Sequence, residues 1–270
     1  MERREFLKHI KLGTLSAAAL PIVNSELFAD SLNRHDIDAK FEKKALLSSD
    51  VYLPSDDYKI LKSVKNKLKL IQRHVGYGHF NIISFDRAVK TARWGRGIKR
   101  FSKEELNFME AIYYYDPSIH GFFGQRTSLN LSDTINKKEV KKMPRTGHYL
   151  FKGKTVDTYE HMKKDVGNTI VLTSGVRSIV KQMKLYIDKI DKTQGNLSKA
   201  SKSLAPPGFS YHTIGDFDVG KKGFGYSNFT PRFALTKEFQ RMRKLKYIDM
   251  RYTINNKDGV RYEPWHIKTI

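Results

Sequence analysis

The chain has 270 residues, of which 39% are hydrophobic and 29% are charged, and its formal net charge is +22. This composition is that of a folded globular protein and excludes a disordered or membrane-embedded chain. The absence of cysteine excludes disulfides and thiolate zinc sites. The positive charge favours polyanionic partners, namely nucleic acid, anionic lipid or an anionic cell-wall polymer.

The N-terminus has the pattern of an export signal. Residues 3–8 read Arg-Arg-Glu-Phe-Leu-Lys, and a weakly apolar stretch follows over residues 10–23. That stretch is too short, and interrupted by Lys11, to span a bilayer. It resembles a bacterial twin-arginine signal with Glu2 in place of the usual serine or threonine, and the alternative is a basic amphipathic helix. We expect a signal peptide over residues 1–29.

Export has consequences for location and partners. An exported chain would be periplasmic, with no transmembrane anchor after signal cleavage. Nucleic acid would then not be a partner, and anionic envelope polymers would account for the positive charge more simply.

Residues 30–140 are predicted to form a mainly helical region that starts with a polar arm over residues 30–54. A helix starts at Ser55 and ends at Gly76, because apolar residues recur at three- and four-residue spacing: Leu61, Val64, Leu68, Ile71 and Val75. Its outer face carries lysines that are either solvated or in contact with an anionic wall polymer: Lys59, Lys62, Lys65, Lys67 and Lys69. Further helices are expected over residues 85–94 and, after a capping box at Ser102, up to Tyr115.

Residues 141–270 differ in character, because strand-like and helical segments alternate there. The strand-type segments are 147–151 and 169–173, and the helical ones are 156–165 and 179–190. The sequence therefore predicts an α+β fold, with a small antiparallel sheet and flanking helices that carry a zinc site, preceded by the helical region.

The stretch 210–220 follows a Pro-Pro-Gly turn and contains His212 and Asp218, and the second acid–imidazole pair is Glu263 with His266. Two histidines and an aspartate can hold a catalytic zinc that keeps a fourth position for water, with the glutamate as base. Pro264 forbids a helix at the second pair, so a distorted strand or a turn must aim its two side chains.

Arg177 lies at a predicted strand-to-helix junction, where a side chain can point into a cleft. The alternative is a structural arginine that pairs with a carboxylate.

Three motifs in this order resemble the VanY-type D-alanyl-D-alanine carboxypeptidases. They are Ser-Gly-x-Arg-Ser at 174–178, Ser-x-His-x-x-Gly-x-x-Asp at 210–218 and Glu-Pro-Trp-His at 263–266. These zinc peptidases share a fold with lysostaphin-type endopeptidases and the hedgehog signalling domain. The resemblance covers roughly residues 140–270.

The resemblance implies a role for each motif residue. The zinc ligands would be His212, Asp218 and His266, and Glu263 would be the catalytic acid/base. Arg177 would polarise the scissile carbonyl and stabilise the oxyanion. Substrate-binding residues would be Ser210, Gln182 and Ser174.

The implied substrate is the peptidoglycan stem peptide, cut at its terminal D-Ala-D-Ala bond. Two alternatives remain: a peptidase that cuts another bond in peptidoglycan with the same site, and a non-catalytic wall-binding protein.

One departure from the family pattern leaves the carboxylate ligand open. The family has six residues between the first histidine and the aspartate, with alanine two positions before the aspartate, whereas five residues separate His212 from Asp218. Either one residue is missing after Gly215, or Asp216 is the ligand. The aliphatic Val219 after Asp218 matches the family and favours Asp218.

Overall fold

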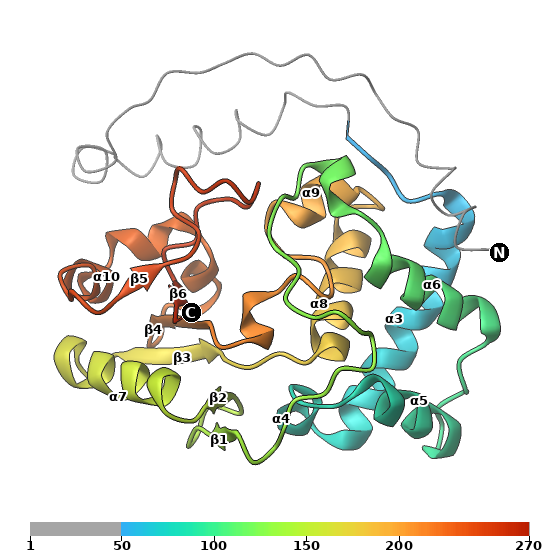
Figure 1. Cartoon of the computed structure of the whole chain (residues 1–270), viewed down its shortest axis with the longest axis horizontal. Helices are drawn as coiled ribbons and strands as arrows, with labels where there is room; N and C mark the ends of the chain where they lie inside the picture. Colours follow the sequence, from blue (N-terminus) through green and yellow to red (C-terminus); the bar gives the residue numbers. More distant parts are fainter. Residues whose placement is uncertain (1–49, 270) are drawn as a thin grey trace.

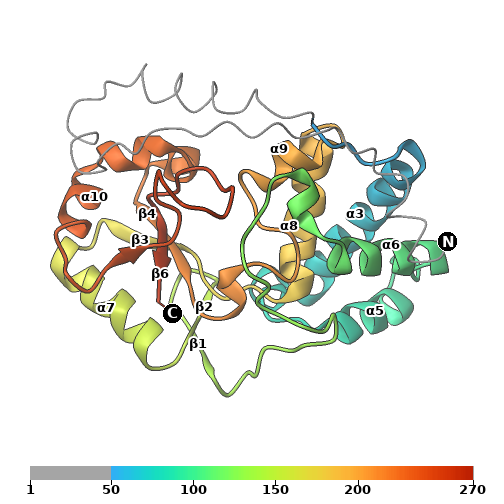
Figure 2. The same ribbon diagram turned by 45° about the horizontal axis from the view of Figure 1, so that its top comes forward.

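The structure is a computed structural model that describes residues 50–269 (Figure 1). The predicted signal segment and most of the predicted polar arm lie outside these residues. In both views the helices α3, α5, α6 and α8 gather on one side, and the strands with α7 and α10 lie on the other (Figures 1 and 2). This arrangement confirms the predicted α+β class. Within residues 50–269, no helix has the length and apolar character needed to cross a membrane.

The N-terminal region is helical, as predicted, and its elements begin and end at local sequence signals. Helix α6 starts at a capping box in which Ser102 and Glu105 bond each other's backbone amides. Gly76 ends the first helix at a φ of 86°, a conformation that favours glycine. The elements are α3 (Ser55–Val75), α4 (Tyr77–Phe80), α5 (Phe85–Trp94), α6 (Lys103–Tyr114) and the 3-10 helix η1 (Pro117–His120).

The rest of the chain forms two antiparallel sheets with short helices between the strands. A two-stranded sheet pairs β1 with β2, and a four-stranded sheet has the order β3-β4-β6-β5. The elements are β1 (Val140–Lys142), β2 (Tyr149–Phe151), α7 (Lys154–Val166), β3 (Ile170–Ser174), α8 (Ile179–Lys192), α9 (Leu197–Ser201), η2 (Tyr211–Thr213), β4 (Phe217–Lys221), η3 (Gly225–Phe229), η4 (Pro231–Leu235), α10 (Lys237–Met242), β5 (Asp249–Met250) and β6 (His266–Lys268).

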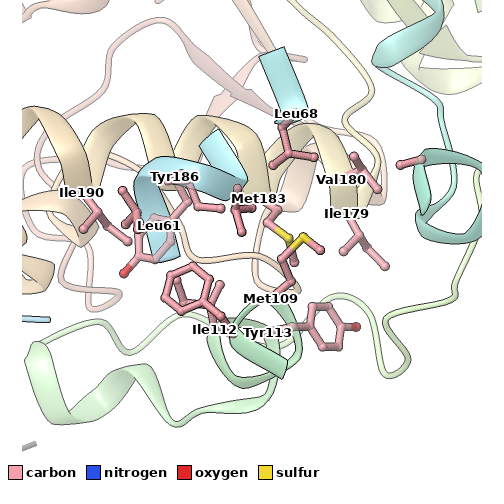
Figure 3. Close-up of a cluster of buried hydrophobic side chains, with 14 of the residues drawn as sticks. Leu61, Leu68, Met109, Ile112, Tyr113, Ile179, Val180, Met183, Tyr186 and Ile190 are labelled. Atoms are coloured by element: carbon pink, nitrogen blue, oxygen red, sulfur yellow. The ribbon is translucent and has the colours of Figure 1, made fainter. Parts of the chain in front are cut away.

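Helix α8 joins the two sides, because its apolar stripe packs with α3 and α6 in one buried cluster (Figure 3). Met183 and Tyr186 of α8 are fully buried there, as is Leu61 of α3. The predicted division of the chain at residue 140 stays a prediction. The packing shows that a helix from the C-terminal part completes the core of the N-terminal helices.

A second buried cluster lies behind the four-stranded sheet. Phe217 and Val219 of β4 and Ile267 of β6 are fully buried there against α7 and α10. Because side chains alternate across a strand, the residues between these apolar ones face the opposite side of the sheet. That opposite side is where the polar motif residues lie.

Part of the lysine face of α3 is paired within the fold. Lys65 forms an ion pair with Asp191 of α8, and Lys67 forms one with the buried Glu105 of α6. These two lysines therefore tie α3 to its neighbours. Lys62 instead lies over the ring of Tyr58, at 4.8 Å from its centroid.

We expect Glu105→Gln to lower the free energy of unfolding by about 2–3 kcal/mol at pH 7, since it leaves the amine of Lys67 without its carboxylate. Burial alone would raise the pKa of Glu105, but hydrogen bonds from Lys67, Ser63 and the Ser102 amide lower it below its ordinary 4.5. The wild-type carboxylate thus stabilises the fold above that pH, and its contribution is lost as the pH falls through the lowered pKa.

Denaturant unfolding of wild type and variant between pH 7 and pH 3 measures this difference, which should shrink toward acid. The control is Glu110→Gln on the exposed face of the same helix, which should change little. A deficit that stays constant across this pH range would contradict the pairing.

Candidate active site

His212 sits in the 3-10 turn η2, which docks on the loop between β3 and α8. The Arg177 amide donates to the His212 carbonyl at 3.3 Å, and the Thr213 hydroxyl donates to the Arg177 carbonyl at 3.1 Å. The His212 Nδ1 lies 3.0 Å from the Gly175 carbonyl, which can only accept, so Nδ1 carries the proton. The lone pair of Nε2 is therefore left to face the site.

Gly175 is needed for this docking. A side chain there would place its Cβ 2.1 Å from the carbonyl oxygen of Tyr149. That same oxygen accepts a hydrogen bond from the Val176 amide at 2.8 Å. The glycine of the first motif thus lets the loop pack close enough to β2 to present its carbonyl to His212.

Asp218 and His266 lie directly opposite each other on β4 and β6. Residues opposite each other on antiparallel strands share a face, with Cβ atoms about 5 Å apart. The Asp218 Oδ1 lies 3.2 Å from the His266 Nδ1, and its Oδ2 lies 3.2 Å from the His212 Nε2. Strand register therefore brings Asp218 and His266 together across a gap of some fifty positions in the sequence, and the docking of η2 adds His212.

Glu263 and His266 are the two ends of a tight turn. The His266 amide donates to the Glu263 carbonyl at 3.1 Å, and Pro264 takes the second position, which proline favours. The turn leaves the Glu263 Oε2 at 3.9 Å from the His266 Nδ1. The prediction that a turn or distorted strand aims these two side chains is confirmed.

The cluster His212, Asp218 and His266 has the character of a metal site. One ligand atom from each residue lies within 4.8 Å of the others, and all three residues are buried. The Asp218 Oδ1 is buried, and its 3.2 Å contact with the His266 Nδ1 lacks the geometry of a hydrogen bond. Two imidazoles and a carboxylate form a donor set that suits zinc, and such an ion would satisfy the unpaired oxygen.

Asp216, the alternative ligand, lies behind His266 and is completely buried. Its Oδ2 accepts from the His266 Nε2 at 3.1 Å and from the Arg251 Nε at 2.8 Å. Its Oδ1 accepts from the Arg251 Nη2 at 3.2 Å and from the Thr269 amide at 3.0 Å. The carboxylate thus holds the far nitrogen of the imidazole and turns Nδ1 toward Asp218.

Arg177 points from its loop to the same cluster. Its Nη2 donates to the Asp218 Oδ2 at 2.7 Å, and its Nε donates to the Ser174 hydroxyl at 2.8 Å. Gln182 is fully buried; its Oε1 accepts from the Arg177 Nη1 at 3.4 Å, and its Nε2 donates to the Ala205 carbonyl at 2.6 Å. Ser174 and Gln182 thus hold the Arg177 guanidinium in place. That they also contact a substrate stays a prediction.

A cavity of about 110 Å³ opens onto the cluster, and Ser210 and Gln182 line it together with Arg177, Glu263, His212, Asp218 and His266. Two further polar residues that the sequence did not single out, Arg261 and Tyr252, also line it. Arg261 Nε lies 3.6 Å from the Glu263 Oε1. No spacing or motif marks Arg261 or Arg251, because their roles arise only where distant segments meet.

His148, in the turn before β2, does not line the cavity. Burial, followed by the charges of Arg177 and Lys181, lowers its pKa to about 4, so its imidazole is neutral at neutral pH.

The charges of the cluster follow from burial and from the neighbours. Burial and the Arg177 guanidinium lower the pKa of His212 to about 4 and keep it neutral. Burial alone would raise the pKa of Asp218, but the two histidines and Arg177 hold it well below its usual range. Burial raises the pKa of Glu263 to about 7, partly offset by Arg261 and His266. Burial would lower the pKa of His266, but its hydrogen bonds to Asp216 and Asp218 raise it to about 9 in the metal-free cluster. The cavity therefore holds an ionised aspartate and a protonated His266 beside a glutamate whose pKa is raised, and binding of a metal would displace the His266 proton.

The C-terminal part of the chain, which carries this site, matches a known protein family. Residues 152–269 match the family model described as VanY: D-alanyl-D-alanine carboxypeptidase. The matched segment contains all three motifs and supports the VanY-type resemblance for the C-terminal part of the chain. No match is found among curated protein sequences.

Solved structures give weaker likenesses. A mutant of the vancomycin-resistance D,D-pentapeptidase VanY in complex with Zn(II) is 20% identical, with a TM-score of 0.40 over 48% of this chain and 78% of that chain. The LD-carboxypeptidase LdcB is 22% identical, with a TM-score of 0.39 over 48% and 63%. The D,D-dipeptidase VanXYg in complex with a D-Ala-D-Ala phosphinate analogue is 20% identical, with a TM-score of 0.39 over 50% and 60%.

We expect Asp216→Asn to weaken zinc binding by roughly 10- to 100-fold, the usual effect of removing the carboxylate that orients a ligating histidine. Titration of the metal-free protein with Zn²⁺ against a chromophoric chelator measures the affinity without any need for catalysis. Asp249→Asn, at an exposed site on β5, is the matched control and should bind zinc like wild type. Unaltered zinc affinity in an Asp216→Asn variant that is verified to be folded would show that the carboxylate does not orient His266.

Proposed function

We propose that this protein is a zinc-dependent carboxypeptidase that removes the terminal D-alanine from peptidoglycan stem peptides. The observation that carries the proposal is the convergence of His212, Asp218 and His266 beside the Glu263 carboxylate and the Arg177 guanidinium. The match of residues 152–269 to the VanY family model supports it. Hydrolysis of this polymer requires the periplasmic location that residues 1–29 predict, and that location stays a prediction.

The proposed ligands are the His212 Nε2, the His266 Nδ1 and an Asp218 oxygen. Zinc supplies Lewis acidity, which polarises a carbonyl and makes water more acidic. Glu263 accepts the proton of the attacking water on Oε2, the oxygen nearer the ligand cluster, and then passes it to the leaving amine. Burial favours uptake of this proton, because it raises the pKa of the Glu263 carboxyl in the metal-free site.

Arg177 stabilises the negative charge that develops on the scissile carbonyl oxygen. A single donor of this kind contributes about 3–4 kcal/mol to the transition state. Its Nε is held by Ser174 and its Nη1 by Gln182, so the guanidinium is oriented before substrate arrives.

We expect Glu263→Gln to lower the rate of D-alanine release from a soluble pentapeptide by about 10²- to 10⁴-fold, because it removes the proton acceptor. Zinc content is measured on the same sample and should be retained, since Glu263 is not among the proposed ligands. Glu160→Gln on the exposed face of α7 is the control. Wild-type rates in Glu263→Gln would refute the mechanism.

The position of Arg261 favours carboxypeptidase activity over endopeptidase activity. It lines the cavity on the Glu263 side, and its Nη2 is anchored to the Phe229 carbonyl at 2.9 Å. A guanidinium placed there can pair with the free carboxylate at the end of a substrate. An internal peptide bond offers no such group, so we propose that Arg261 selects chain ends.

We expect Arg261→Gln to raise KM about 10- to 100-fold for a peptide that ends in D-alanine carboxylate. The same peptide ending in D-alanine carboxamide should show little change between wild type and variant. Comparing the two peptides cancels any effect that the substitution has on the nearby Glu263. Equal losses on both peptides would mean that Arg261 acts on Glu263 alone.

The alternative cleavage positions in peptidoglycan use the same residues and differ in their products. Mass analysis of digested muropeptides identifies the bond that is cut. A wild-type protein that binds zinc and muropeptides without releasing any product would favour the non-catalytic wall-binding alternative.

A further inference from the structure

A second and larger hollow lies outside the segment that matches the family model. This groove, of about 840 Å³, is formed by the end of α3, by α4 and α5, and by residues 134–137. Its floor is apolar, with the buried Ile82 and Ile83 and the half-buried Val75 and Ile135. A hollow of this size is in the range of ligand sites.

The rim of the groove is basic and carries no acidic residue. It consists of His74, His79, Arg87, Lys90, Lys137 and Trp94. Within residues 50–269, no ion pair involves Arg87, Lys90 or Lys137, and all three are exposed. Trp94 is 79% exposed, which is unusual for an indole and typical of a contact surface.

The segment that lines the groove is in contact with the loop that carries Arg177. Asn81, between the groove residues His79 and Ile82, accepts from the Ser178 amide at 2.7 Å and donates to the Gly147 carbonyl at 3.0 Å. Ile82 also packs in one buried cluster with Val176. A long polymer lying in the groove would therefore run beside the loop that helps to form the candidate active site.

We propose that this groove binds the glycan strand of peptidoglycan, a polymer of acetylated amino sugars that carries carboxylates, and this assignment rests on the proposed function. The flat apolar face of a pyranose ring suits the exposed indole of Trp94. The acetyl methyl groups suit the aliphatic floor. The lactyl carboxylates of the strand, which are free wherever the stem peptide is absent, pair with Arg87, Lys90 and Lys137.

Nucleic acid fits the groove less well. Proteins that bind single strands place successive bases on several aromatic side chains along a basic channel. The described lining of this groove contains a single Trp, Tyr or Phe residue, Trp94.

The test measures binding of metal-free protein to glycan strands from which the stem peptides have been removed, so that it needs no catalysis. These strands keep one lactyl carboxylate per disaccharide. Neutral oligomers of N-acetylglucosamine have the same rings without charge, and polyglutamate and single-stranded DNA carry charge without these rings. The variants are Trp94→Ala and the double variant Arg87→Ala/Lys90→Ala.

Matched controls lie elsewhere on the surface. Lys163→Ala/Lys164→Ala on exposed positions of α7 removes the same charge, and Tyr52→Ala removes another exposed aromatic ring. We expect the double groove variant to weaken binding of the charged glycan by roughly tenfold and Trp94→Ala to weaken binding of both glycans. The controls should bind like wild type, and thermal unfolding verifies that each variant is folded.

Equal losses in the α7 control would overturn the proposal, because binding would then depend on overall charge. Unchanged glycan binding by Trp94→Ala would overturn it too, as would DNA that binds more tightly than glycan through the same residues. Failure of the proposed function is separate: it would appear as no hydrolysis of a soluble pentapeptide by the zinc-loaded wild-type protein.

Discussion

The pairing of β4 with β6 is the constraint on which the candidate site depends. It sets Asp218 opposite His266, and the same alternation sends Phe217, Val219 and Ile267 into the core behind the sheet. A slip of one residue would exchange these faces, placing a carboxylate in the core and a phenyl ring in the site. The buried apolar residues thus fix the register that the metal ligands need.

Helix α8 extends this constraint to the rest of the molecule. Near its N-terminus, Gln182 holds Arg177 and the backbone at Ala205, while its apolar stripe is buried against α3 and α6. The N-terminal helical region therefore supports the candidate site, because it packs against α8, the helix whose Gln182 orients Arg177. Displacing α3 would disturb the guanidinium without touching any motif residue.

Local signals made much of the fold predictable. The capping box at Ser102 and the break at Gly76 define helix ends through contacts within a few residues, and the three motifs point to the side chains that converge. Contacts between segments that are distant in the sequence are not marked by any local pattern. The partnership of Asp216 with Arg251 and the shape of the groove depend on how loops meet in space, which periodicity does not encode.

The buried pair of Asp216 and Arg251 has an evolutionary consequence. Asp216 is completely buried, so losing Arg251 alone removes the guanidinium that balances its charge, and such single losses are strongly destabilising. The family pattern has alanine two positions before the aspartate, at the position of Asp216. A lineage that replaced Asp216 with alanine would also have to replace Arg251, and the intermediate with only one of the two changes would be unstable. We therefore expect Asp216 and Arg251, which directly follows β5, to be inherited together.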